Sequence, residues 1–480
     1  MSSIGTNLIF NILRNIANII FPLITAPYIA RILDPNSLGL ANFANTYASY
    51  FILVAALGIP NYGIREIAKN RDDKNKLSQT FSELFSINIL TTLCSSILFI
   101  ASILVIHQLN ADYLIFLIAG ISLFTSPFSI DWFFLGVEDV QYITIRSLFI
   151  KIICIICLFL FVKDNNDLII YVLINVLYGT LSQIWNFIVL YKKGIKIKIV
   201  RTGYKKHLKP LLLLFSSMIA VSLYTTINVV MLGFLSTYNQ VSFYNQANNI
   251  ARAFLAIVTS FSEIMVPRIS YYSKDINWNM ISNLINKSFA IVSFIAIPIA
   301  LGIIIIAPIL IPLFLGPNFY GSIRPLQIMS LITVIIGFNN ITTVQILLSM
   351  GHDYMLLKSV LWGAGTNILL NIFLIPWIGA EGASISSVLA EVVILIVSYV
   401  FVRKVAQIRF IIIQNIVKSC IGTILFIPLF FILNSFFDNW LLIAFYAVSC
   451  ILIYIISQFF LKNEAFYMIF HYLQTKIRIK

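Results

Sequence analysis

A stripe of polar side chains runs along one face of segment 7–31, an apolar stretch long enough to cross a bilayer. A helix brings residues three and four apart onto one face, and its other faces here carry Ile, Leu, Phe and Ala. A guanidinium inside a membrane costs roughly 2.5 kcal/mol or more, so Arg14 must face protein or a water-filled cavity. We interpret the segment as the cavity-lining helix of a transporter. The stripe consists of the polar residues Asn7, Asn11, Arg14, Asn15, Asn18 and Thr25, together with Pro22.

The chemistry of these residue types suits an anionic sugar-bearing ligand. An arginine binds phosphate through two parallel hydrogen bonds and stays charged when desolvated. Arg14 in the first half of the chain and Arg252 in the second could therefore clamp one headgroup. Amides would provide donors and acceptors for sugars, although each one could equally serve as an interhelical hydrogen bond worth ~0.6 kcal/mol. The candidate amides are Asn11, Asn15, Asn18, Asn45 and Asn248.

Three acids, Asp131, Glu263 and Glu391, also fall at membrane depth, where ionisable residues are functional candidates. Their depths predict two ion pairs, Arg14 with Asp131 and Arg252 with Glu391. Such pairs could merely hold the helices together, but apolar replacements often stabilise as well. We therefore favour coupling sites for H+ or Na+ as the role of the acids.

Catalytic and metal-binding patterns are missing from the sequence, which lacks a nucleophile elbow, a P-loop and metal-ligand histidine spacing. Cys154 and Cys157 share a helical face but have no nearby histidine, so we expect them to pack. The sequence therefore predicts no enzyme, no metal site and no cofactor beyond a coupling ion. Without an ATPase motif, transport would draw on an ion gradient, the membrane potential or the gradient of the substrate.

The composition is that of a polytopic membrane protein. Of the 480 residues 60% are hydrophobic and 10% charged, whereas soluble proteins carry about 25% charged residues. The chain is therefore expected to be all-α, with about fourteen transmembrane helices. The apolar segments cover residues 8–32, 38–58, 80–106, 112–136, 142–162, 167–191, 210–234, 241–267, 285–311, 323–350, 354–375, 380–402, 414–434 and 438–461.

Loop charges predict the orientation of these helices. With a cytoplasmic N-terminus, the outward loops contain only Arg31, Lys163 and Arg324, and we place Arg14 and Arg252 within spans. The other basic residues then face inward, as the positive-inside rule requires, so both termini are predicted to be cytoplasmic. The net charge of +14 thus reflects topology and anionic lipid rather than nucleic acid. The start of the chain does not resemble a removable signal peptide.

Two bundles are predicted from the basic connection that follows the sixth helix. Residues 38–65 align weakly with 241–268, and both would run from outside to inside, as in a parallel repeat around a central cavity. We expect two pseudo-symmetric six-helix lobes plus two C-terminal helices. The boundaries are an N-lobe at 1–191, a linker at 192–209, a C-lobe at 210–403, two further helices at 404–461 and a cytoplasmic tail at 462–480.

Two segments resemble a known family. PYIARILDPNSLGLANFANTYASYFILVAALGIPNYGIREIAKNR (27–71) resembles the first two helices of the polysaccharide-repeat-unit flippases. DWFFLGVEDVQYITIRSLFIK (131–151) is similar to the junction of the fourth and fifth helices in that family. These flippases belong to the multidrug/oligosaccharidyl-lipid/polysaccharide exporter superfamily. The resemblance covers essentially the whole chain and is weaker in the second half.

This resemblance implies an alternating-access flippase in a bacterial cytoplasmic membrane. Its substrate would be an undecaprenyl-pyrophosphate-linked oligosaccharide, a precursor of capsule, O-antigen or teichoic acid. Arg14 and Arg252 would meet the pyrophosphate, and Trp132, Gly136 and Glu138 would belong to the junction motif. Membrane lipids and polysaccharide assembly machinery are the implied partners.

Other functions fit the sequence less well. A cation-coupled multidrug exporter of the same superfamily is the main alternative, but it would want an acidic, aromatic pocket for cationic drugs. A membrane glycan polymerase or ligase would need a large outward loop with polar catalytic groups. A non-transporting lipid scaffold would not need a first helix that is polar and bent by Pro22 and Pro27.

Overall fold

The computed structural model describes residues 4–198, 204–274, 277–408, 410, 413–437 and 439–478. Within these ranges every regular element is helical, which confirms the all-α prediction. Twelve helices in this part of the chain are long and apolar enough to cross a membrane. A bent pair, Lys205–Ser222 and Thr225–Leu235, makes thirteen if it counts as one span, close to the predicted fourteen. The chain is a multi-pass membrane protein.

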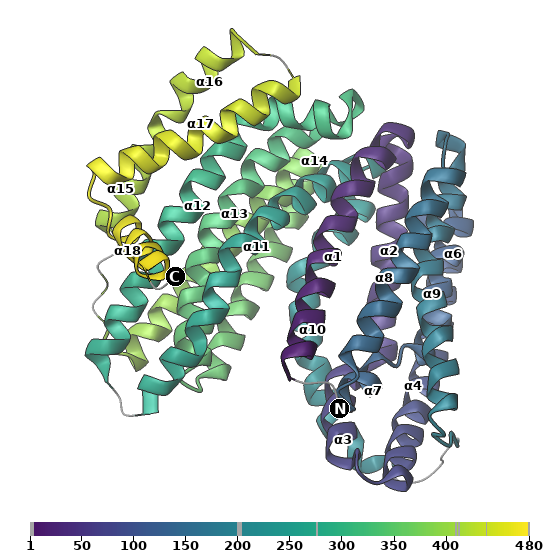
Figure 1. Cartoon of the computed structure of the whole chain (residues 1–480). Coiled ribbons are helices and arrows are strands. Elements are labelled where there is room, and N and C mark those ends of the chain that lie inside the picture. The colour runs from purple at the N-terminus through teal and green to yellow at the C-terminus, as the bar shows by residue number, and fades with distance from the viewer. Residues whose placement is uncertain are drawn as a thin grey trace. The chain divides into compact units, whose positions relative to one another are not determined.

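The chain forms two compact units, Met1–Ser242 and Phe243–Lys480 (Figure 1). The first unit is built on long helices joined by short turns. Its helices are α1 (Ile4–Ile32), α2 (Pro35–Ala56), α3 (Ile59–Asn70), α4 (Lys74–Val105), α5 (His107–Ala111), α6 (Tyr113–Phe124), α7 (Asp131–Gly136), α8 (Val140–Phe161), α9 (Leu168–Lys192) and α10 (Lys205–Leu235).

Local signals explain where α2 and α3 begin. The Asp34 carboxylate caps α2 by accepting from the Ser37 amide at 2.7 Å, and Pro35 occupies the first turn, where its missing N–H is harmless. Leu57 and Gly58 then take left-handed conformations, with φ of 44° and 80°, so α3 starts in a new direction. The repeat-aligned segment is continuous helix instead, within α11 (Tyr238–Lys274).

The predicted span 112–136 is broken into two helices. A short 3₁₀ turn, Ser126–Phe128, separates α6 from α7. Pro127 lies in this turn, and proline both lacks a backbone donor and disfavours helix in the residue before it. As a result Asp131 lies in the first turn of a short new helix rather than inside a continuous span.

The second unit starts within α11 and carries the longest helix. α14 has 53 residues, which is roughly 80 Å of helix, far more than a bilayer core of about 30 Å. Its backbone leaves helical geometry at Ile378 and Gly379, which divides it into the predicted spans 354–375 and 380–402. The other helices are α12 (Trp278–Leu315), α13 (Ile323–Asn340), α15 (Ile413–Ile424), α16 (Phe426–Asn434), α17 (Asn439–Phe460) and α18 (Glu464–Arg478), with a π-helical turn at Ile341–Leu348.

α10 belongs to the first unit in this structure, where it packs on α2 and α3. Near its 60° bend, the Tyr50 hydroxyl of α2 donates to the Ser222 carbonyl at 3.2 Å. The predicted C-lobe, 210–403, instead begins with this helix. The linker at 192–209 and the lobe boundaries therefore stay predictions. The two compact units are defined by their internal contacts, and these contacts do not show which helices move together.

Candidate functional site

The two segments that carry the family resemblance pack against each other in the first unit. α3 lies on α7, and Gly63 faces the ring of Trp132, where an added Cβ would clash. Gly136 likewise faces Ile67, whose Cγ2 would lie 2.6 Å from an added Cβ. Trp132 is buried, and its ring stacks on that of Phe81 with centroids 5.5 Å apart. This junction fixes the backbone beside Asp131.

Glu138, the third junction residue, closes the same contact by an ion pair. Its Oε1 accepts from Arg71 Nη1 at 2.6 Å, joining the segment after α7 to the end of α3. Trp132, Gly136 and Glu138 thus have packing and pairing roles in this structure. They position the neighbouring site rather than form it.

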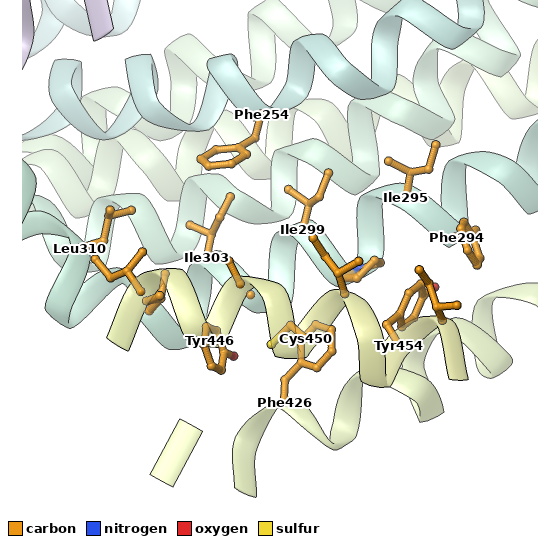
Figure 2. Close-up of a pocket in the computed structure, with 17 residues that line it drawn as sticks. Phe254, Phe294, Ile295, Ile299, Ile303, Leu310, Phe426, Tyr446, Cys450 and Tyr454 are labelled. Atoms are coloured by element: carbon orange, nitrogen blue, oxygen red, sulfur yellow. The ribbon is translucent and has the colours of Figure 1, made fainter. Parts of the chain in front are cut away.

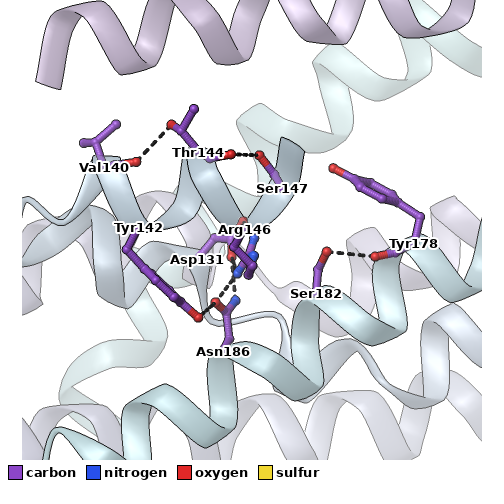
Figure 3. Close-up of polar contacts among 9 residues, drawn as sticks. All are labelled: Asp131, Val140, Tyr142, Thr144, Arg146, Ser147, Tyr178, Ser182 and Asn186. Carbon is purple, nitrogen blue, oxygen red and sulfur yellow. Dashed lines mark hydrogen bonds and ion pairs between the residues drawn. The ribbon is translucent and has the colours of Figure 1, made fainter. Parts of the chain in front are cut away.

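Asp131 is the acceptor of a polar network at the junction of α7, α8 and α9 (Figure 3). Arg146 of α8 binds it with both guanidinium nitrogens, Nη1 to Oδ1 at 3.0 Å and Nη2 to Oδ2 at 3.2 Å. Asn186 of α9 donates to Asp131 Oδ1 at 2.6 Å and accepts from Arg146 Nη1. The Tyr142 hydroxyl donates to Asn186 Oδ1 at 3.2 Å. The Arg146 side chain is only 3% exposed, against 44% for Asp131.

The predicted pair of Arg14 with Asp131 is therefore wrong, because Arg146 already binds both oxygens of that carboxylate. Arg146 and Lys151 are not among the predicted site residues, because both were assigned to the inward loops, yet both lie in α8, a candidate span. The rule that singles out Arg14, that an ionisable residue in a span is a functional candidate, would have found them.

Lys151 provides a second cation beside the stripe on α1. Its ammonium donates to Asn18 Oδ1, and it lies 5.2 Å from the ring centroid of Phe21 and 5.6 Å from that of Tyr178. Lys151 is half-buried between α1 and α9. Aromatic faces attract such a cation, so Asn18, Phe21 and Tyr178 together fix the position of the ammonium group.

Arg14 lies on α1, one turn before Asn18, the residue that binds Lys151. Its Nη2 donates to Asn11 Oδ1 at 3.2 Å, one turn back on α1. Thr144 of α8 donates its hydroxyl to the Phe10 carbonyl at 3.3 Å, which holds α1 on α8. Asn15 is exposed, so its amide is accessible to a ligand.

Arg14 and Lys151 form a cationic patch between α1 and α8. Arg14 and Lys151 carry like charges on two helices that pack together, so the two repel each other. Among the residues that the structure describes, neither makes an ion pair with a carboxylate, and the hydrogen-bond acceptor of each is an asparagine oxygen. An anion bound between them would relieve this repulsion.

In the second unit the predicted pair of Arg252 with Glu391 is also wrong. Arg252 is exposed, and its Nε donates to Asn248 Oδ1 at 2.9 Å on the same helix. Glu391 of α14 is 5% exposed, and its Oε2 accepts from Asn339 Nδ2 at 2.5 Å. Asn339 also donates to the Glu391 carbonyl at 3.0 Å. Glu391 is thus a buried carboxyl whose observed partner is an uncharged amide.

Two predicted site residues lie outside these contacts. Glu263 belongs to α11, but its side chain is outside the described part of the structure. Asn45 is half-buried on α2, and within the described ranges it makes no hydrogen bond to the polar groups of α1 or α8. The structure therefore brings together Asn11, Arg14 and Asn18 with Lys151, and it joins Asn248 only to Arg252.

An apolar groove lies in the second unit between α12 and α17 (Figure 2). Its volume is about 460 Å³, and its wall includes side chains from α11, α12, α16 and α17. Such a surface suits a hydrocarbon chain, because its lining is mostly aliphatic and aromatic. Residues labelled in Figure 2 include Phe254, Ile299, Ile303, Phe426, Tyr446 and Tyr454.

Two family models match this chain. The model described as polysaccharide biosynthesis protein matches residues 4–273, and that described as lipid II flippase MurJ matches residues 144–451. A protein described as an O-antigen transporter, from Escherichia coli (strain K12), is 26% identical over 84% of this chain and 97% of its own length. A protein of the same description from Shigella dysenteriae is 26% identical, over 81% of this chain and 98% of its own.

Solved structures share the fold. The lipid II flippase MurJ in an inward closed conformation superposes with a TM-score of 0.77 at 16% identity, covering 95% of this chain and 99% of that one. An inward-facing multidrug resistance MATE family transporter of the MOP superfamily gives a TM-score of 0.61 at 15% identity, covering 82% and 94%. The chain therefore belongs to the polysaccharide biosynthesis protein family, the polysaccharide flippases of the MOP superfamily.

Proposed function

We propose that this protein flips an undecaprenyl-pyrophosphate-linked oligosaccharide from the inner to the outer leaflet of a bacterial cytoplasmic membrane. The substrate would be a precursor of O-antigen, capsule or teichoic acid, and both termini would lie in the cytoplasm. The observation that carries the proposal is the cationic patch of Arg14 and Lys151, two repelling charges that no described carboxylate neutralises. The family membership and the O-antigen transporter relatives support it.

The patch has the chemistry that a pyrophosphate headgroup requires. A guanidinium and an ammonium together supply several charged donors, and charge-assisted hydrogen bonds are roughly twice as strong as neutral ones. Asn11, Asn15 and Asn18 would then offer amides to the first sugars. The polyprenyl tail would stay in lipid, and the apolar groove of the second unit could hold part of it.

Alternating access would be driven by an ion, with Glu391 as the main coupling group. A buried carboxylate is unfavourable unless it is protonated or paired with a cation. Asn339 supplies a hydrogen bond but no charge, so Glu391 would take up H+ or Na+ in one part of the cycle. Asp131 is a weaker candidate because Arg146 already neutralises it, and Glu263 remains a third.

Binding to the purified protein tests the proposal. We would measure the affinity of wild type for a polyprenyl-pyrophosphate oligosaccharide and for a lipophilic cationic drug. Arg14→Ala and Lys151→Ala should each weaken saccharide-lipid binding by about tenfold or more, since a charge-assisted hydrogen bond is worth roughly 1.5–3 kcal/mol. Lys163→Ala, in an exposed turn between α8 and α9, is the control and should bind like wild type.

The other outcomes are equally informative. If wild type binds the drug and not the saccharide lipid, the protein is the multidrug exporter instead. If the saccharide lipid binds equally well to all four proteins, the substrate class is right, but the cationic patch is not its binding site.

A further inference from the structure

A second buried cluster of polar side chains lies where the start of α10 packs on α3 and α4. His207, in the first turn of α10, places its Nε2 2.8 Å from Glu83 Oε2. Its Nδ1 lies 2.7 Å from the Tyr62 hydroxyl of α3. The Glu83 and His207 side chains are 3% and 4% exposed. One imidazole thus bridges two helices that lie far from it in sequence.

Glu83 collects further donors at the same point. Lys206 Nζ lies 2.8 Å from its Oε2, and Gln79 Nε2 donates to its Oε1 at 3.1 Å. The guanidinium of Arg65 lies over the Tyr62 ring, 5.3 Å from the centroid. Lys206 and His207, in the first turn of α10, are therefore both bound by one carboxylate of α4.

The chain that leads toward α10 is attached next to this cluster. The Lys198 amide donates to Ser82 Oγ at 3.1 Å, and Ser82 Oγ lies 3.3 Å from the Lys196 carbonyl oxygen. Ser82 directly precedes Glu83. Both the described end of the connection and the first turn of α10 are thus held on the same turn of α4.

The polar contacts of Glu83 with His207 and Lys206 can be broken and formed again. A buried ion pair is a weak source of stability compared with apolar packing, and its best-attested use is to specify register or a switch. A cavity of about 320 Å³ adjoins the cluster and is lined by polar side chains, among them Lys76, Thr80 and Lys206. Water in this cavity could replace the contacts as they separate, whereas an apolar contact would expose hydrocarbon.

We propose that Glu83, His207 and Tyr62 form a latch that holds the first turns of α10 on α3 and α4, and that its release is a required step of transport. The second part rests on the proposed function, because it assumes a transport cycle. The latch is the polar part of this attachment, and Leu211, buried in the same hydrophobic core as Tyr62, adds an apolar part. It takes no part in binding the substrate.

Hydrogen exchange tests whether the latch holds α10. In Glu83→Gln, amide exchange in residues 205–212 should rise by about tenfold or more, since the change removes the charge that binds Lys206 and weakens the hydrogen bond to the buried His207 imidazole. Tyr62→Phe keeps the ring and should give a smaller rise in the same residues. Lys76→Gln is the control, because Lys76 lines the cavity but pairs with the exposed Asp73. Unchanged exchange in both latch variants would overturn the proposal.

Cross-linking tests whether release is required. Cysteines replace Tyr62 and His207 in a chain whose native cysteines are alanine, and a reducible bifunctional thiol reagent joins them. Transport of polyprenyl-pyrophosphate oligosaccharide in proteoliposomes should fall by about tenfold or more and return on reduction, while binding persists. Transport that is unaffected by the cross-link would overturn the proposal. The native cysteines are Cys94, Cys154, Cys157, Cys420 and Cys450.

The same assay separates this proposal from the proposed function. If wild type carries the lipophilic cation and not the saccharide lipid, the proposed function fails, and the cross-link is scored on the cation in the same way. If wild type carries neither cargo, the proposed function and the required release of the latch are both wrong, while hydrogen exchange still decides whether the latch holds α10.

Discussion

At the scale of single residues, cations that are bound by a carboxylate differ from those that are not. The first kind is expected to stabilise the fold, and the second is expected to bind the substrate. Arg146 is buried and bound by both oxygens of Asp131, so its charge is neutralised within the protein. Arg14 and Lys151 have only asparagine oxygens as described hydrogen-bond partners, so their charges remain available to a ligand. We infer that Arg146 holds α7, α8 and α9 together, while the cationic patch meets the substrate.

A double-mutant cycle on Asp131 and Arg146 tests this division. Asp131→Asn leaves a buried guanidinium without its counter-ion and should lower the free energy of unfolding by about 3 kcal/mol. Arg146→Met should cost less, because Asp131 is partly exposed and keeps the Asn186 donor. The double variant should be more stable than Asp131→Asn alone, as measured by denaturation in detergent.

The ion pair of Arg71 with Glu138 is the matched comparison. It joins the end of α3 to the segment after α7 and is partly exposed, so Arg71→Gln should change the free energy of unfolding by about 1 kcal/mol or less. Strictly additive losses for Asp131→Asn and Arg146→Met would show that these two residues do not act as a pair.

Glu391→Gln tests the coupling role of the buried carboxyl. The amide keeps the size of the side chain and can still bond Asn339, but it can neither carry a charge nor take up a proton. Transport in proteoliposomes should lose its dependence on an imposed Na+ or H+ gradient while the fold is kept. Glu381→Gln, on the same helix but in a partly exposed pair with Arg324, should retain that dependence. Gradient dependence that persists in Glu391→Gln would remove Glu391 from the coupling mechanism.

At the scale of elements, the break in α14 decides how the chain crosses the membrane. Gly379 has φ of 52° and ψ of −123°, a conformation that side chains with a Cβ strongly disfavour. Pro376 lies three residues earlier and removes another backbone donor from the helix. These two residues turn one helical stretch into two spans.

Gly379→Ala should therefore be destabilising. Holding alanine in this conformation should cost about 1–3 kcal/mol of the free energy of unfolding, measured by denaturation in detergent. Gly365→Ala is the matched control in the same helix, because nothing lies within 4 Å of its added Cβ. It should be neutral or stabilising by up to about 1 kcal/mol. A loss of the same size in both variants would mean that the break does not depend on Gly379.

The elements were more predictable from the sequence than their contacts. A span needs about twenty apolar residues, so α8 and α9 lie within a few residues of the predicted 142–162 and 167–191. The partner of Asp131 could not be predicted, because it depends on how α8 is rotated about its axis, which depth alone does not give. Arg146 rather than Arg14 faces the carboxylate for this reason.

At the scale of the whole molecule, the number of crossings determines whether the two termini lie on the same side of the membrane. With α14 counted as two spans and the bent α10 as one, the described helices account for an even number of crossings. An even number returns the chain to its starting side, in agreement with the strong concentration of Lys and Arg in alternate loops. If α14 crossed once, the two termini would lie on opposite sides and that concentration would be lost.

Labelling with a membrane-impermeant maleimide in intact cells distinguishes these topologies. In a chain without native cysteines, Trp377→Cys should react from outside, because Trp377 is 88% exposed beside the break, which the predicted topology places at the outer surface. Lys192→Cys, at the end of α9, should react only after the cells are permeabilised, because its loop is predicted to face inward. Both labelling patterns follow from the charge distribution, since the opposite orientation would place the loops rich in Lys and Arg outside, against the positive-inside rule. Reaction of Lys192→Cys in intact cells would show that the predicted orientation is wrong. The end of α1 that is nearer to Arg14 would then lie at the outer rather than the inner surface.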